Sequence, residues 1–185
     1  QRQMCIRDSA HGGRWGTLLF QGAPLQAATQ PPVLVQQHAR ELGFSVLENL
    51  SAALRPQAGN KPQALREQID TRLQALGATA VAAHLQQRVI DLPRGLARQV
   101  AILRAAFSGS ALLLIDEPTS ELEPAEAEAV LTLIERLSAN HCCLVSLHHQ
   151  GQARRIASRV ILMAGGHVQV DAPVDAFFAN SGPVS

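Results

Sequence analysis

Two adjacent acidic residues, Asp116 and Glu117, directly follow the apolar run "ALLLI" at 111–115. A run that is apolar on both faces is typical of a central strand in a parallel sheet. Side chains at the carboxyl end of such a strand face the ligand crevice. There, the first carboxylate suits a hard cation, and the second could orient or deprotonate a water molecule. By itself, the dipeptide is equally typical of a solvated turn.

The pattern around this pair predicts the elements that must position it. Alternating strands and helices in the second half of the chain predict a doubly wound α/β core. A helical block between residues 45 and 92 interrupts that core, with one apolar stripe in its long helix. The expected strands are 16–22, 32–37, 111–116 and 142–147, followed by a hairpin at 159–170; the expected helices are 45–54, 62–77, 80–86, 95–107, 124–140, 152–158 and 174–180.

Composition describes an ordinary globular chain of 185 residues, with 46% hydrophobic residues and a net charge of +1. This charge provides no basic field for nucleic acid, so no nucleic-acid partner is expected. No apolar stretch reaches the length that crosses a bilayer. The three cysteines do not suggest a disulfide framework, and the adjacent Cys142 and Cys143 are expected to be buried small hydrophobes of a cytoplasmic protein.

The first nine residues, "QRQMCIRDS", lack signal-peptide architecture. Their sequence matches one reading frame of a sequencing adapter, so we expect residues 1–9 to be non-native. On this hypothesis the natural chain is truncated at its amino end.

The stretch "LLLIDEPTSELEP" resembles the Walker B and D-loop segment of ATP-binding cassette (ABC) ATPases, which usually ends in DEPTSALDP. Four further motifs follow the family's order: "VLVQQ" with "SVLENL" for the Q-loop, "RQVAILRAAF" for the helix before Walker B, "CCLVSLHH" for the switch strand, and "ASRVILMAGGHVQVDAP" for the final hairpin. The resemblance implies a P-loop NTPase (RecA-like) core of ABC type, incomplete at the N-terminus, formed by 10–37 and 96–185. An all-helical subdomain, 38–95, would be inserted and would end in a degenerate signature motif.

The resemblance also implies roles for single residues. Asp116 and Gln36 would bind Mg²⁺, and Glu117 would act on the water that attacks ATP. His148 would be the switch histidine that contacts the γ-phosphate, and Glu123 takes the place of the D-loop aspartate. Two assignments stay open, because Gln37 could replace Gln36 as the Q-loop glutamine and His149 could replace His148 as the switch histidine. Arg159 favours His148, because the family commonly has an arginine eleven residues after its switch histidine.

One departure from the family concerns the phosphate-binding loop, G-x-x-x-x-G-K-[ST]. The Gly-rich stretch "HGGRWGT" at 11–17 contains no lysine and leads into a strand rather than a helix. Such a stretch cannot cradle phosphates with a helix N-terminus. The chain as given is therefore expected to bind ATP poorly and to be nearly inactive as an ATPase.

A second departure is "LPRGL" at 92–96, where the family has LSGGQ. Pro93 lacks the serine hydroxyl that would reach the γ-phosphate of the opposed subunit. Arg94 replaces a glycine and could supply a cation, block the phosphate, or simply be solvated. Gly95 is retained, while Leu96 has lost the amide of glutamine. These changes predict a slow or asymmetric ATPase.

The leading functional hypothesis is therefore the ATPase subunit of an ABC transporter, an importer, with a weak likeness to phosphonate importers in "SLHH". Its expected partners are permease subunits, a second ATPase subunit in a homodimer or heterodimer, and indirectly a solute-binding protein. Its expected place is the cytoplasmic face of the membrane. The alternative is a non-catalytic cassette that senses nucleotide or assists assembly. A chromosome-repair ATPase fits poorly because a compact helical block replaces the long coiled coil.

Overall fold

The computed structural model describes residues 19–20, 22–25, 31–36, 43–54 and 62–180. The predicted non-native segment 1–9, the Gly-rich stretch 11–17 and Gln37 lie outside these residues. Among the described residues, no helix combines the length and the apolar character needed to cross a membrane.

The centre of the fold is a parallel sheet of three strands in the order β3 (Val33–Val35), β4 (Leu112–Ile115) and β5 (Cys142–Val145). Helix α5 (Pro124–Leu137) connects β4 to β5, as the alternating pattern predicts. In register, Val35 pairs with Ile115 and Ile115 with Val145, so the three strands end at the same level. The predicted α/β class with a parallel sheet is confirmed.

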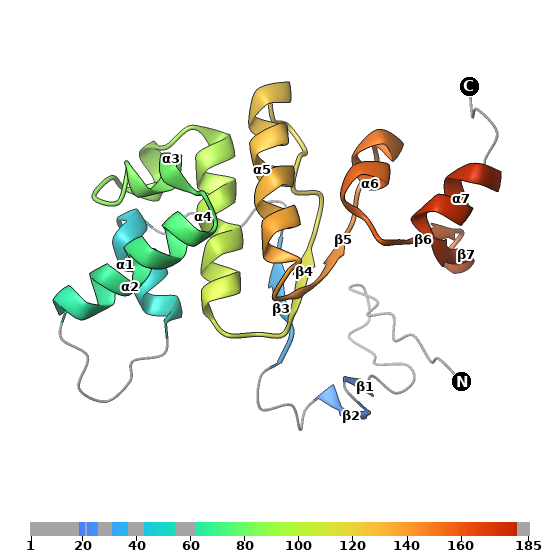
Figure 1. Ribbon diagram of the computed structural model, residues 1–185, viewed down its shortest axis with the longest axis horizontal. Helices are drawn as coiled ribbons and strands as arrows, with labels where there is room; N and C mark the ends of the chain where they lie inside the picture. Colours follow the sequence, from blue (N-terminus) through green and yellow to red (C-terminus); the bar gives the residue numbers. More distant parts are fainter. Residues whose placement is uncertain (1–18, 21, 26–30, 37–42, 55–61, 181–185) are drawn as a thin grey trace.

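A helical block precedes β4 and comprises α1 (Val46–Ala53), α2 (Pro62–Ala75), α3 (Thr79–Ala82) and a 3₁₀ turn at Val89–Asp91. Ser45 begins α1 with a capping box, in which its hydroxyl accepts from the Glu48 N–H and the Glu48 carboxylate accepts from Ser45. The Ser45 hydroxyl also donates to the Glu48 carboxylate at 2.7 Å, and this bond, together with the bond from the Ser45 backbone N–H, lowers the pKa of Glu48. Figure 1 shows this block at one end of the molecule.

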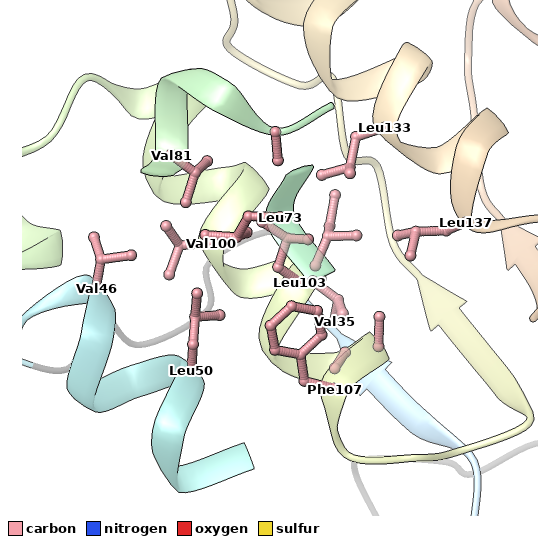
Figure 2. Packing of buried hydrophobic residues seen from close by; sticks show 14 of the residues in the cluster. Val35, Val46, Leu50, Leu73, Val81, Val100, Leu103, Phe107, Leu133 and Leu137 are labelled. Carbon is pink, nitrogen blue, oxygen red and sulfur yellow. The ribbon is translucent and has the colours of Figure 1, made fainter. Parts of the chain in front are cut away.

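Helix α4 (Arg94–Phe107) packs against both the helical block and the sheet. Its buried Val100 and Leu103 belong to the same hydrophobic cluster as Val46 and Leu50 of α1, and Leu133 on α5 points into the same interior (Figure 2). The core is therefore continuous from the block to the sheet. The predicted stripe of the long helix, α2, lies in it, with Ile69 and Leu73 fully buried. Helix α5 also buries one apolar face: Val130, Leu131, Ile134 and Leu137.

The C-terminal part contains α6 (Gln150–Ile156), the antiparallel hairpin of β6 (Arg159–Ala164) and β7 (His167–Pro173), and α7 (Val174–Asn180). Gly165 and Gly166 form its turn with φ of 57° and 76°, which glycine adopts without steric cost. This hairpin is the one that the sequence predicts. At the other end of the described chain, β1 (Leu19–Phe20) and β2 (Ala23–Pro24) form a small antiparallel pair.

The expectation that "CCLVSL" is a buried strand is wrong. Cys142 is exposed because it lies on the same uncovered face of the sheet as Leu144, and Cys143, on the opposite face, is half-buried. Burial raises the pKa of Cys143 to about 11, with a smaller contribution from Cys142, so this thiol stays protonated at neutral pH. Leu34 and Leu144 are each 54% exposed and align with Leu114 between them, so one face of the sheet meets solvent.

Candidate functional site

Three polar residues directly follow the ends of the three parallel strands: Gln36 after β3, Asp116 after β4 and Ser146 after β5. The Asp116 N–H donates to the Val35 carbonyl at 2.9 Å, and the Ser146 N–H donates to the Ile115 carbonyl at 3.0 Å. These bonds extend the ladders beyond the strands, so the residues lie side by side along one edge. All three are exposed. The sheet thus brings together the predicted Gln36 and Asp116.

Glu117 lies in the turn beyond this edge and adopts a φ of 43°, which is uncommon for a residue other than glycine. Its N–H donates to Ser146 Oγ at 2.8 Å, and its carbonyl accepts from the Ser120 N–H at 3.1 Å. Its carboxylate oxygen Oε1 is 2.5 Å from His148 Nε2. The structure therefore brings together the two predicted catalytic residues, Glu117 and His148.

The two adjacent histidines differ in position. His148 contacts the Glu117 carboxylate and has 78% of its side chain exposed, so it can reach both that carboxylate and the solvent in front of it. His149 precedes α6, where its carbonyl accepts from the backbone N–H groups of Gln152 and Ala153. This geometry favours His148 for contact with a ligand at the strand ends.

The oxygen donors at the strand ends fit a magnesium ion. Mg²⁺ is usually bound through one or two carboxylates together with phosphates and several waters. Asp116 is exposed, and a carboxylate offers about four lone-pair positions, of which Ser146 Oγ takes one at 2.6 Å. Gln36 adds an amide oxygen at the same edge. Within the described residues, no cluster of three or more histidine, cysteine or acidic side chains could hold a metal ion.

The residues at the signature position begin α4. Pro93 is its N-cap and Arg94 its first residue, and the Arg94 guanidinium lies 3.4 Å from Glu121, with both side chains largely exposed. Gly95 is buried, and its N–H donates to Glu126 Oε1 at 3.1 Å. The other oxygen of Glu126 accepts from the N–H of Glu123, the N-cap of α5, at 3.4 Å. Glu126 thus joins the first turns of α4 and α5.

Gly95 also has a packing role in this contact. A Cβ at this position would lie 2.7 Å from Glu126 Cβ, a distance that real Cβ atoms do not adopt. The missing side chain of Gly95 therefore lets α5 approach α4, in addition to the phosphate approach that the resemblance implies.

Gly95→Ala is expected to destabilise the fold. Overpacking against Glu126 costs about 1–3 kcal/mol, and the higher helix propensity of alanine offsets up to about 1 kcal/mol. Gly151→Ala in α6 is the matched control, because its Cβ meets nothing within 4 Å. Urea unfolding of both variants should show a loss of free energy of unfolding only for Gly95→Ala. An equal or higher stability of Gly95→Ala would contradict the close contact.

Three of the residues that hold the site, Ser146, Glu126 and Gln152, were not expected from the sequence. Ser146 contacts both members of the acidic pair, and Glu126 contacts Gly95 and Glu123. A third link joins Thr119 Oγ1 to Gln152 Oε1 at 2.8 Å, between the acidic turn and α6. The role of Ser146 could have been inferred from its position directly after a predicted parallel strand. The roles of Glu126 and Gln152 depend on contacts between distant segments.

Comparison with protein-family models finds no match for this chain. Among curated proteins, the chain is 37% identical over 164 residues to the aliphatic sulfonates import ATP-binding protein SsuB 2 of Pseudomonas fluorescens, covering 86% of this chain and 57% of that protein. It is 35% identical over 102 residues to the phosphonates import ATP-binding protein PhnC of Burkholderia pseudomallei, covering 54% of this chain and 33% of that protein. The chain thus spans between a third and about three fifths of these relatives.

Among solved structures, the chain resembles cbiO1 of Clostridium perfringens, described as part of the ABC transporter complex cbiONQ. The TM-score is 0.73 at 20% sequence identity, covering 90% of this chain and 69% of that one. At this identity the likeness shows the fold. It is the fold that the motif order predicts, a P-loop NTPase core of ABC type.

Proposed function

We propose that this chain belongs to the ABC ATPase family and is the ATP-binding part of a transporter subunit that couples MgATP hydrolysis to solute import. The observation that carries this proposal is the grouping of Gln36, Asp116, Glu117 and His148 at the carboxyl edge of the parallel sheet. Oxygen ligands for a cation and an acidic side chain that can act on water are two of the parts that phosphoryl transfer to water uses.

Each residue has a proposed task in this reaction. Asp116 and Gln36 would hold Mg²⁺, which, when bound, neutralises charge on the phosphates. Glu117 would accept a proton from, or orient, the attacking water, and the bond from its N–H to Ser146 Oγ holds the turn that carries its side chain. His148 would donate a hydrogen bond to the γ-phosphate. Its contact with Glu117 links the presence of that phosphate to the position of the general base.

The proposed partners follow from the same mechanism. Two ATPase subunits, identical or different, would enclose nucleotide between the strand-end site of one and the α4 start of the other, where Pro93, Arg94, Gly95 and Glu123 would lie near the interface. The closing of the two ATPase subunits around nucleotide would be transmitted to permease subunits, and a solute-binding protein would deliver the cargo to the permease. The subunit would then lie at the cytoplasmic face of the membrane.

The proposed cargo is a small anion. The names of the similar proteins mention phosphonates, aliphatic sulfonates and, in the Escherichia coli relative GltL, glutamate and aspartate, all of which are anionic solutes. A phosphonate is the narrower proposal, supported by the likeness to PhnC.

A chimera tests the proposed activity. The 185-residue sequence contains no G-x-x-x-x-G-K-[ST] motif, so we would join the phosphate-loop segment of the SsuB 2 relative to residues 19–185 of this chain. The chimera is expected to hydrolyse MgATP, whereas the 185-residue chain should release little phosphate. A folded chimera that binds MgATP without hydrolysing it would contradict the proposal and favour the non-catalytic alternative.

A further inference from the structure

Ser146 lies where the switch segment meets the acidic pair. It is the first residue after β5, and its backbone N–H donates to the Ile115 carbonyl at 3.0 Å, which continues the β4–β5 ladder. Its side chain therefore emerges at the strand-end edge beside Asp116. The sheet register fixes this position because Val145 pairs with Ile115.

The hydroxyl of Ser146 makes two hydrogen bonds of opposite sense. It accepts from the Glu117 N–H at 2.8 Å and donates to Asp116 Oδ1 at 2.6 Å. An amide N–H can only donate and an ionised carboxylate can only accept, so the direction of both bonds is settled. The single proton of the serine consequently points at Asp116, and Asp116 Oδ1 is held toward β5.

The same hydroxyl contributes to the unusual backbone of Glu117. A φ of 43° costs about 1–3 kcal/mol for a residue other than glycine and persists only where neighbours hold it. The Glu117 N–H is held by Ser146, while its carbonyl accepts from the Ser120 N–H at 3.1 Å and from Arg98 at 3.4 Å. Without the Ser146 hydroxyl, the Glu117 N–H loses the acceptor that holds this side of the turn.

We propose that Ser146 is a positioning residue that fixes the Asp116 carboxylate for cation binding and the Glu117 turn for its work on water. This inference rests on the proposed function, because it assigns the cation to Asp116. Removing a group that hydrogen-bonds to a metal ligand and orients it typically lowers metal affinity by about 10- to 100-fold. Ser146 is such a group for Asp116, and one hydroxyl serves both acidic residues at once.

Binding of Mn²⁺, a paramagnetic substitute for Mg²⁺, to the 185-residue chain tests the inference. Electron paramagnetic resonance would measure free Mn²⁺, and line broadening in NMR spectra would locate the ion near Gln36 and Asp116. Ser146→Ala is expected to weaken binding about tenfold or more and to speed hydrogen exchange at the Glu117 amide. Ser146→Thr, which keeps the hydroxyl at an exposed position, is expected to bind Mn²⁺ like the unmodified chain.

Two controls separate the possible failures. Ser138→Ala removes a hydroxyl at the end of α5, where it donates to the Glu135 carbonyl, and should leave Mn²⁺ binding unchanged. Asp116→Asn should abolish the localised binding. Binding that depends on Asp116 but is equal in Ser146→Ala overturns this inference alone, as does a Ser146→Thr variant as weak as Ser146→Ala. Binding that persists in Asp116→Asn overturns both the inference and the proposed cation site.

Discussion

Glu117→Gln in the phosphate-loop chimera is expected to lower the rate of MgATP hydrolysis by about 100- to 10,000-fold. The amide keeps the size of the carboxylate but cannot accept a proton from the attacking water. It can still receive a hydrogen bond from His148, whose Nε2 lies 2.5 Å from Glu117 Oε1. The fold and the affinity for MgATP should therefore change little. Phosphate release and isothermal titration would measure the two quantities separately.

Glu67→Gln is the matched control for this experiment. Glu67 lies in α2, where its side chain accepts from Gln63 on the exposed surface of the helix. The same chemical change at this site should leave hydrolysis unchanged. If Glu117→Gln retained most of the rate, the general base would have to be another residue, and the proposed task of Glu117 would be wrong.

Restoring the family signature in the chimera, by Pro93→Ser, Arg94→Gly and Leu96→Gln together, is expected to raise turnover about tenfold or more. A hydrogen bond to a charged group contributes about 1.5–3 kcal/mol, which corresponds to roughly 10- to 100-fold in rate. The serine hydroxyl would supply such a bond to the γ-phosphate of the opposed subunit. A steady-state ATPase assay across chimera concentrations would also show whether the gain requires dimerisation.

Arg94→Gly alone separates two explanations. Arg94 pairs with Glu121 at 3.4 Å with both side chains largely exposed, so breaking the pair has a small effect on stability. If Arg94 blocks the phosphate, its removal alone should recover part of the rate. If it supplies a useful cation, its removal should lower the rate further. A triple variant with unchanged turnover would show that "LPRGL" does not limit this ATPase.

The sequence was sufficient to predict the sheet and the strand-end group. The resemblance of the motifs implied a shared magnesium site for Gln36 and Asp116, and the parallel strands place both residues at one edge of the sheet. The apolar stripe of α2 also followed from helical spacing, because Ile69 and Leu73 are four residues apart and both are buried. These are local patterns, and local patterns determine which face of an element is apolar.

Other features could not be predicted because they depend on contacts between distant segments. The hydrogen bond from the Gly95 N–H to Glu126 joins residues 31 positions apart, and the hydrogen bond from Ser146 to Asp116 joins residues 30 positions apart. The exposure of Cys142 escaped prediction for a related reason. An apolar run shows that a strand can be covered on both faces, but not whether a neighbour covers it.

The open face of the sheet affects how the isolated polypeptide behaves in solution. Leu34 and Leu144 contact water on one face, and β3 and β5 present backbone edges among the described strands. Contiguous exposed apolar side chains and unpaired strand edges are the features that promote aggregation as concentration rises. With a net charge of only +1, electrostatic repulsion between molecules is weak. Dilute samples at low temperature, or fusion to a highly charged carrier, therefore suit handling of this chain.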